Sequence, residues 1–308
     1  MKHLITGAGG FLGTYLAQTL RTTDPRAEVL SLGLNPPVDP QVRHLPCDLL
    51  DAPTLSAFVE REKPERVYHL AGSARVSQSI GMPEYYRSNF QTTVNLIDAL
   101  EESGHPVRLF FSSSVHIYGN QPQEVDEVSE AAPNGPYGMS KYLGERAVES
   151  FVQRRPAARA VVGRLYSCIG PGQAEGFVTS DLTRKLLRLS DGEALQTGPL
   201  SALRRFLDVR DAVQIIARLL EKPLPQPYEA VNIASPFEMQ VSDVVDLLVK
   251  ASGKKVQIQS STADTNSFQG LKISLKKLDR LVPGFPFRPI ESTLADLWQW
   301  GVRELAPS

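Results

Sequence analysis

Five short, almost wholly apolar segments are spaced along the first 165 residues, at 2–6, 27–32, 66–70, 107–112 and 158–163. Their apolar residues follow one another instead of alternating with polar ones. That pattern is typical of strands in a parallel sheet covered on both faces. Longer amphipathic stretches lie between the segments, so the sequence predicts an α/β fold with a doubly wound parallel sheet and right-handed crossovers.

The amphipathic stretches have the three- and four-residue apolar spacing of helices. Before residue 165 this spacing covers residues 11–21, 52–62, 84–103 and 137–154. After Gly170 the alternation stops, and helical spacing returns at 177–189, 209–221 and 241–252, with one strand-like segment at 228–234. We expect a sheet domain at 1–165 and a smaller, mostly helical lobe at 166–308, whose chain returns to the sheet at about 204–234.

Composition excludes several classes of protein. The chain has 33 Lys and Arg against 34 Asp and Glu, which leaves no basic field to hold a nucleic acid backbone. Its apolar runs are far shorter than the roughly 18 residues of a membrane span, and the first residues lack the pattern of a signal peptide. Two cysteines, Cys47 and Cys168, cannot build a disulfide framework or a metal cage. We therefore expect a globular cytoplasmic protein with no metal, no membrane partner and no nucleic acid partner.

A glycine-rich turn joins the first expected strand to the first expected helix. Gly7, Gly10 and Gly13 are three residues apart, and Phe11 and Leu12 begin the helix. The first glycine allows the tight turn, the second lets a pyrophosphate approach the backbone, and the third lets the helix pack closely on the strand. The helix N-terminus adds free N–H groups and a positive dipole end. This position predicts a dinucleotide site on a Rossmann sheet.

The end of the second expected strand bears on which dinucleotide binds. A carboxylate that holds the ribose hydroxyls of NAD is usual there, but residues 32–35 read Leu-Gly-Leu-Asn. The lack of a carboxylate favours NADP(H) or the use of both cofactors. However, this segment has no arginine that could bind the 2′-phosphate of NADP(H). Asp48, followed by Leu49, is a candidate for contact with the adenine, and the alternative is a helix N-terminal cap.

A tyrosine and a lysine share one face of the helix expected at 137–154. Tyr137 and Lys141 are four residues apart, and Ser114 lies at the end of the strand before them. A free phenol has a pKa of about 10, and lowering it by three units takes roughly 4 kcal/mol. A lysine ammonium and an oxidised nicotinamide would both favour the phenolate. The serine hydroxyl, at a strand end where ligands bind, can share a hydrogen bond with the same substrate oxygen.

Together these motifs resemble an extended short-chain dehydrogenase/reductase of the nucleotide-sugar epimerase/dehydratase group. The matching segments are the glycine turn, residues 69–72, Asn89, residues 112–119, 137–141, 164–173, 176–178 and 204–209. The resemblance implies NAD(P) in the larger lobe, beside Leu70, Ala71 and Gly72, and a nucleoside-diphosphate sugar in the smaller one. It makes Tyr137 the acid and base, and Ser114 the group that polarises the reacting oxygen. Lys141 would hold the nicotinamide ribose and tune Tyr137.

The same resemblance implies a set of substrate contacts. They are Ser114, His116, Ser167, Phe177, Val178 and Arg204. Arg204 matches the arginine that grips the substrate diphosphate, a role that suits the bidentate guanidinium. Its alternative is a solvated surface charge beside Arg205. Ser167 replaces the usual asparagine, and Arg205 stands where an aspartate is usual, so the base and the sugar stay open.

The residues after Ser114 separate the reactions of the group. Similar sugar 4,6-dehydratases have an acid there, usually an Asp/Glu pair, whereas this chain has Val115 and His116. We therefore do not expect a dehydratase. His116 either titrates near neutrality against the sugar or is satisfied by neighbouring backbone.

Two reactions within the group remain. The segments at 170–178, 180–185 and 204–209 are most similar to reductases of GDP-4-keto-6-deoxy-mannose, which reduce the C4 ketone with NAD(P)H. The alternative is an NAD-dependent 4-epimerase, which uses the same serine, tyrosine and lysine. A third hypothesis, from another class, is a non-catalytic NAD(P)-binding protein.

The expected helices 84–103 and 137–154 carry apolar residues on more than one face. Examples are Val94, Ile97, Leu100, Leu143, Ala147 and Phe151. In the resembling family these helices pair with their copies in a four-helix bundle, so we expect a homodimer. A helix buried inside one subunit would show the same pattern.

Overall fold

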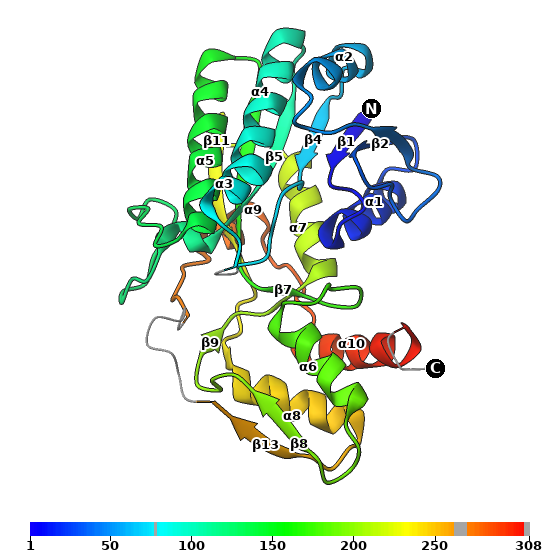
Figure 1. Ribbon diagram of the computed structural model, residues 1–308. Helices are drawn as coiled ribbons and strands as arrows, with labels where there is room; N and C mark the ends of the chain where they lie inside the picture. The colour runs from blue at the N-terminus through cyan, green and yellow to red at the C-terminus, as the bar shows by residue number, and fades with distance from the viewer. Residues whose placement is uncertain (77–78, 262–269, 305–308) are drawn as a thin grey trace.

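The computed structural model describes residues 1–76, 79–261 and 270–304. Its centre is a parallel sheet in the order β11-β6-β5-β4-β1-β2-β3 (Figure 1). The strands are β1 (Lys2–Thr6), β2 (Glu28–Gly33), β3 (Arg43–Pro46), β4 (Arg66–His69), β5 (Arg108–Ser114), β6 (Arg159–Leu165) and β11 (Tyr228–Ile233). The strand order reverses between β1 and β4, which are hydrogen-bonded neighbours. The expected α/β fold is therefore confirmed.

Helices cover both faces of the sheet, which explains why its strands are apolar at consecutive positions. Successive strand residues point to opposite faces, so Leu109 and Phe111 pack on one side and Phe110 on the other. The first face carries α2 (Ala52–Glu62), α4 (Thr92–Ser103) and α5 (Pro136–Arg154). The second carries α1 (Phe11–Thr23), α7 (Val209–Glu221) and α9 (Lys276–Leu281).

The helix expected at 84–103 differs from the prediction. It begins earlier, as α3 (Met82–Tyr85), passes through a π-helical turn, η1 (Tyr86–Gln91), and only then becomes α4. The wide turn contains Asn89, which is 1% exposed. Its side-chain oxygen accepts from the Ser73 N–H at 2.7 Å, and its nitrogen donates to the Ser140 hydroxyl at 3.0 Å. A π-turn inserts an extra residue into a helix, a feature frequent near functional sites, and here its buried amide joins a loop to α5.

A second apolar cluster forms the smaller lobe at the bottom of Figure 1. Its elements are α6 (Val178–Arg188), α8 (Val241–Ser252), α10 (Ile290–Glu304) and the parallel pair β8 (Ala194–Thr197) and β13 (Gln257–Ser260). Helix α10, which the sequence analysis does not predict, buries Leu294, Leu297 and Trp298 against α6 and α8.

Short strand pairs join the two parts of the molecule. Beyond β6 the chain forms β7 (Cys168–Ile169), which pairs with β10 (Leu207–Asp208), and β9 (Leu203–Arg204), which pairs with β12 (Met239–Gln240). The chain then returns through α7 to β11, at the edge of the sheet beside β6. Within the described ranges, no helix has both the length and the apolarity needed to span a membrane.

Candidate active site

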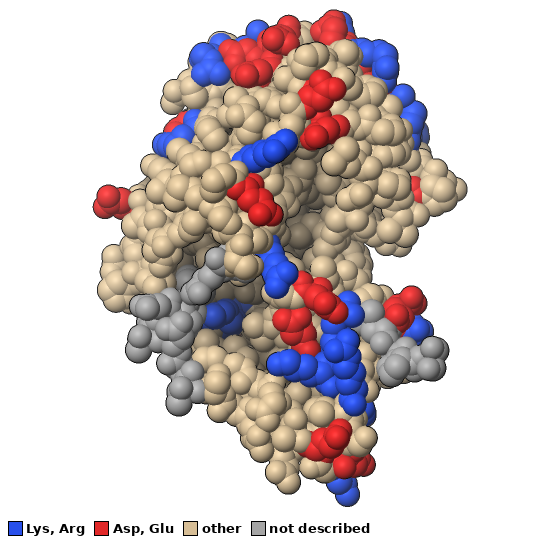
Figure 2. All heavy atoms as spheres, in the orientation of Figure 1, with Lys and Arg blue, Asp and Glu red and all other residues tan. Residues whose placement is uncertain are grey.

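A cavity of about 560 Å³ lies between the two lobes, at the carboxyl ends of the central strands. Figure 2 shows the hollow between the upper and lower parts of the molecule. Its lining combines the glycine turn, the loop after β4, the end of β5, the start of α5, the segments at 165–169 and 173–179, and the side chains of Arg204 and Phe206. In doubly wound sheets, ligands bind outside the carboxyl ends of the strands where the strand order reverses, as it does here.

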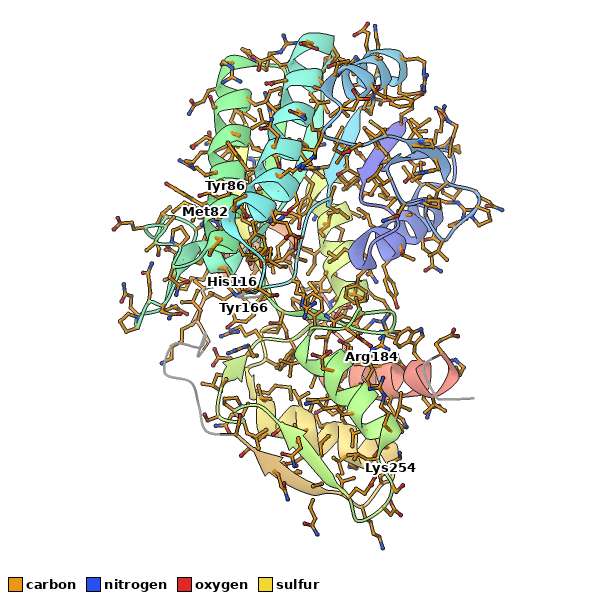
Figure 3. All side chains as sticks on the ribbon, in the orientation of Figure 1. Met82, Tyr86, His116, Tyr166, Arg184 and Lys254 are labelled. Carbon is orange, nitrogen blue, oxygen red and sulfur yellow. The ribbon has the colours of Figure 1, made fainter. Side chains whose placement is uncertain are left out.

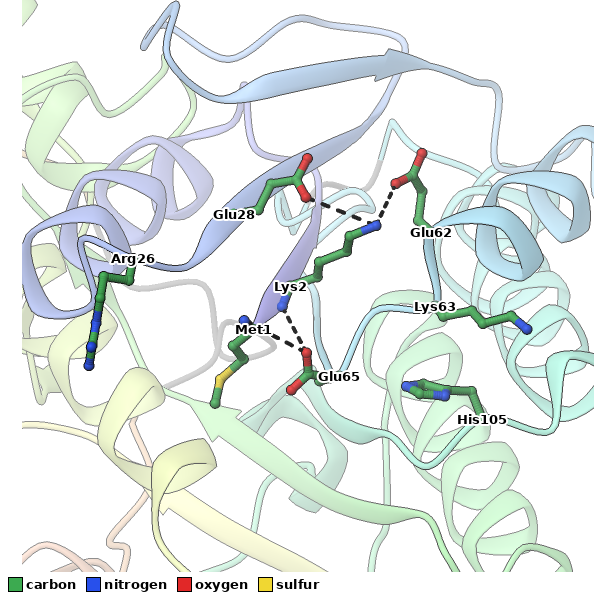
Figure 4. A pocket seen from close by; sticks show the side chains of 8 residues that line it. All are labelled: Met1, Lys2, Arg26, Glu28, Glu62, Lys63, Glu65 and His105. Carbon is green, nitrogen blue, oxygen red and sulfur yellow. Dashed lines mark hydrogen bonds and ion pairs between the residues drawn. The ribbon is translucent and has the colours of Figure 1, made fainter.

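A second hollow, of about 470 Å³, opens at the opposite edge of the sheet (Figure 4). Several of its charged groups pair with one another. The Lys2 ammonium lies 3.2 Å from Glu62 and 4.0 Å from Glu28, and the N-terminal amine lies 3.8 Å from Glu65. This edge offers paired charges in place of a ligand site, so the first cavity is the candidate active site.

The glycine turn has the geometry that a dinucleotide requires. Gly7 adopts φ 74°, in the left-handed region. A Cβ at Gly13 would lie 2.1 Å from the Gly7 carbonyl oxygen, so only glycine lets α1 approach the turn this closely. Gly10 is the N-cap of α1 and provides no side-chain cap, which leaves the first N–H groups of the helix available for a phosphate. Gly7, Gly10, Phe11, Leu12 and Gly13 all line the cavity, as do Leu70 and Gly72.

The segment after β2 lies against this turn, since a Cβ at Gly9 would be 2.6 Å from the Pro36 carbonyl oxygen. The side chains here, including the largely exposed Leu34, carry no carboxylate. The structure places Asp48, Leu49 and Ala71 outside the cavity lining. The Asp48 carboxylate accepts from the Leu50 N–H, whereas the N-cap of α2 is Asp51, so the alternative of Asp48 as a helix cap is wrong. Contact of these three residues with a cofactor stays a prediction.

The structure brings Ser114, Tyr137 and Lys141 together in the cavity. Ser114 ends β5, and Tyr137 and Lys141 begin α5, whose first residue is Pro136. The Ser114 hydroxyl lies near enough to the Tyr137 phenol to lower its pKa. The Lys141 ammonium donates to the Ser112 carbonyl oxygen at 2.9 Å.

Burial controls the charge states of Tyr137 and Lys141. It raises the pKa of Tyr137 to about 12, and the nearby Ser114 hydroxyl only partly opposes the shift. It lowers the pKa of Lys141 to about 8. The Lys141 ammonium donates to the Ser112 backbone, and its tuning of the Tyr137 pKa together with a bound nicotinamide stays a prediction. At neutral pH the phenol carries its proton and can act as a general acid.

His116 lies at the junction of the two lobes, where Figure 3 also shows Tyr166. Its Nδ1 is 3.0 Å from the Ser114 hydroxyl oxygen, and its ring meets the Tyr137 ring edge-on at 5.5 Å. Burial, with the nearby charge of Arg204, lowers the pKa of His116 to about 4. The histidine is neutral at physiological pH, so of its two alternatives the one in which it titrates near neutrality is wrong.

The two neighbouring arginines face different surroundings. Arg204 lines the cavity, and burial lowers the pKa of its guanidinium. Arg205 instead pairs with Glu238 at 3.2 Å and donates to the Pro236 carbonyl oxygen at 2.9 Å. The other expected substrate residues, Ser167, Phe177 and Val178, also line the cavity.

Two residues that line the cavity, Arg75 and Cys168, were not predicted as site residues from the sequence. Arg75 follows β4 and lies over Gly176, where a Cβ would be 2.6 Å from the arginine Nε. Arg75 could have been predicted from the sequence, because it follows the carboxyl end of an expected strand, three residues after Gly72, where ligands bind. Cys168 also lines the cavity, but burial raises its thiol pKa to about 12, so it is no reactive thiolate.

The glycine turn and the serine, tyrosine and lysine beside it are the parts of a dinucleotide-dependent enzyme. The NAD dependent epimerase/dehydratase family model matches residues 3–234, and the chain belongs to this family. Its members include NAD(P)-dependent nucleotide-sugar reductases, dehydratases and epimerases.

Individual relatives are similar along most of their length. GDP-6-deoxy-D-mannose reductase of Pseudomonas aeruginosa is 27% identical over 269 residues, which cover 85% of this chain and 84% of the relative. dTDP-6-deoxy-L-talose 4-dehydrogenase (NAD(P)(+)) of Kitasatospora kifunensis is 29% identical and covers 96% and 93%. The solved structure of MoeE5 in complex with UDP-glucuronic acid and NAD is 27% identical, with TM-score 0.86 over 99% of this chain and 100% of that one. The expected cofactor class, NAD(P), is confirmed.

Proposed function

We propose that this protein uses NAD(P)H to reduce the C4 ketone of a nucleoside-diphosphate 4-keto-6-deoxy sugar, with GDP-4-keto-6-deoxy-mannose as the first candidate. One observation carries the proposal: Ser114, Tyr137 and Lys141 line a single cavity that runs from the glycine turn to Arg204. The similar relative from Pseudomonas aeruginosa, named for a GDP-6-deoxy sugar, supports this substrate class.

The chain's own residues divide the work of this reaction. Gly7, Gly10 and Gly13 hold the pyrophosphate of the cofactor, and Lys141 holds its nicotinamide ribose. The bound nicotinamide supplies a hydride. Ser114 hydrogen-bonds the carbonyl oxygen, and Tyr137 donates its proton to that oxygen as negative charge develops on it.

The substrate side of the cavity suits a diphosphate. The Arg204 guanidinium can grip two phosphate oxygens, and Phe177 and Val178 supply apolar surface beside it. Neither Val115 nor His116 is a carboxylate, which disfavours elimination of water.

A binding screen identifies the substrate. Purified protein is titrated with GDP, UDP, CDP and dTDP, and NADPH consumption is then followed with the 4-keto sugar of the nucleotide that binds best. We expect one nucleotide to bind well above the others. Failure of all four to bind would contradict a nucleotide-sugar substrate.

Replacing Tyr137 by phenylalanine tests the proton donor. The change keeps the ring and removes the hydroxyl, so turnover should fall by roughly 10²-fold or more while the affinity for NADPH stays nearly unchanged. Steady-state kinetics and a cofactor titration measure the two effects. A variant that keeps wild-type turnover would contradict the role of the phenol.

We also propose that the protein forms a homodimer through α4 and α5, in the cytoplasm. Of the apolar residues on these helices, Ile97, Leu100 and Phe151 already pack against the sheet, whereas Val94 and Leu143 stay partly exposed. Light scattering should give twice the chain mass. Leu143→Glu should yield a monomer, since a charge would be buried in the interface. A monomeric wild type would contradict this proposal.

A further inference from the structure

A row of polar side chains crosses the sheet behind the active site. Ser113 of β5 is in register with Arg164 of β6, which is in register with Asn232 of β11. All three are at most 6% exposed. Polar groups are unusual inside a parallel sheet covered on both faces, because each must find a partner there.

Glu145 of α5 is the centre of this row. It is completely buried and accepts hydrogen bonds from the Ser113 hydroxyl at 2.5 Å and from the Arg164 guanidinium at 2.9 Å. Arg164 also donates to the Tyr118 hydroxyl at 2.7 Å, and Tyr118 donates to Asn232 at 2.8 Å. One network therefore joins α5, β5, β6, β11 and the 3₁₀ turn η2 (Val115–Tyr118) that follows Ser114.

The same face of α5 carries the proposed active-site residues. Tyr137, Lys141 and Glu145 are spaced by four residues, so their side chains point the same way. Each faces the last residues of β5: Tyr137 lines the cavity with Ser114, Lys141 donates to the Ser112 carbonyl oxygen, and Glu145 accepts from the Ser113 hydroxyl.

The helix lies unusually close to the strand at this point. A Cβ on Gly144 would be 2.5 Å from the Phe111 ring, so the glycine lets α5 rest on that ring. The contact of α5 with the Phe111 ring is non-directional, so it would let the helix slide along the strand. The ion pair between Glu145 and Arg164 has a fixed geometry and would not.

Stability alone does not account for a buried ion pair. Replacing such a pair by apolar residues of similar volume is often neutral or stabilising, because the desolvation cost offsets the attraction. We propose that Glu145 and Arg164 are positioning residues: their ion pair fixes α5 at the place on β5 where Tyr137 meets Ser114. This proposal rests on the proposed function for the roles of Tyr137 and Ser114.

The central test is the double variant Glu145→Leu/Arg164→Met, which removes both charges and keeps apolar bulk. Displacement of a catalytic group by about 1 Å can cost 10²-fold, so kcat should fall by roughly 10- to 100-fold. The Kd for NADPH should change less than kcat, because the glycine turn that holds the pyrophosphate is on other elements and only the Lys141 contact moves with α5. A folded double variant with wild-type kcat would overturn the proposal.

A matched control lies on the same helix. Arg154 near the end of α5 pairs with Glu101 of α4 at 2.8 Å, and the arginine side chain is 50% exposed. Glu101→Leu/Arg154→Met should leave kcat unchanged. Ser113→Ala is a milder variant that removes one hydrogen bond and keeps the ion pair, so it should lower kcat less. It provides a test if the double variant does not fold, and a Ser113→Ala kcat equal to that of the wild type would then count against the proposal.

A second readout does not depend on the substrate. In protein labelled with ¹³Cζ-tyrosine, the resonance absent from Tyr137→Phe reports the environment of that phenol. Ser114→Ala should shift this resonance, and the Glu145/Arg164 double variant should shift it as well, while the Glu101/Arg154 control should not. An unmoved resonance in the double variant would overturn the positioning role. Lack of wild-type activity with every sugar, by contrast, would count against the proposed function alone.

Discussion

At the scale of single residues, the proposed chemistry depends on a phenol that burial keeps protonated. The pKa of Tyr137 is raised to about 12, so at neutral pH the phenol holds the proton that a developing alkoxide needs. Ser114 and His116 complete its polar surroundings, and the lowered pKa of His116 keeps positive charge out of them.

Arg204 and Arg205 form a natural pair of test and control. Arg204→Ala should raise the substrate KM by roughly 10-fold or more and change kcat little, because charge-assisted hydrogen bonds to phosphate are lost in ground and transition states alike. Arg205→Ala should leave KM close to that of the wild type, since Arg205 already pairs with Glu238. Initial-rate kinetics on both variants measure this. Equal effects on KM would contradict a specific diphosphate role for Arg204.

The sequence predicted which residues line the cavity better than it predicted their charge states. The serine, the tyrosine and the lysine are recognisable from spacing and strand ends, and all three line the cavity. The pKa shifts depend on burial by segments far away in the chain, such as Arg204 beside His116, and local spacing does not encode that. Glu145 was missed for the same reason, because its partner Arg164 is 19 residues away.

At the scale of elements, regular periodicity predicted boundaries well. The bounds of β1, α2, α7 and α8 are those expected from the sequence. The helix expected at 84–103 was wrong in its interior, since the π-helical turn arises from tertiary hydrogen bonds of Asn89. Helix α10 was missed, and its buried face is recognisable only from its packing against α6 and α8.

The junction of β1 and α1 supports a prediction about cofactor binding. Gly13→Ala would place a methyl group 2.1 Å from the Gly7 carbonyl oxygen and force the helix away from the turn. We expect the Kd for NADPH to rise by roughly 10-fold or more, together with a lower Tm. Gly135→Ala is the control, because a Cβ there meets nothing within 4 Å. A cofactor titration in which Gly13→Ala binds like the wild type would contradict the assignment of this turn.

At the scale of the whole molecule, buried histidines make stability depend on pH. His3 is 0% exposed, and burial with the charge of Arg66 lowers its pKa from 6.5 to about 4. Protonation is then harder in the folded than in the unfolded state, so stability is fully present above pH 6.5 and is lost as the pH falls towards 4. His69, with a pKa lowered to about 3, acts in the same direction.

Urea unfolding near neutral pH and near pH 5 measures this loss. His3→Leu should remove about 2 kcal/mol of the difference between the two conditions. A His3→Leu variant with the pH dependence of the wild type would show that His3 is not the group responsible.

The most direct test of the proposed reaction counts NADPH consumed per sugar converted. Enzyme is mixed with NADPH and the 4-keto-6-deoxy sugar of the nucleotide that it binds, and cofactor absorbance and sugar product are followed together. The account predicts that one NADPH disappears for each 4-hydroxy sugar formed, and that Tyr137→Phe binds both ligands and consumes neither. Conversion of a nucleotide sugar at C4 with no net consumption of NADPH would contradict the reductase and identify an epimerase.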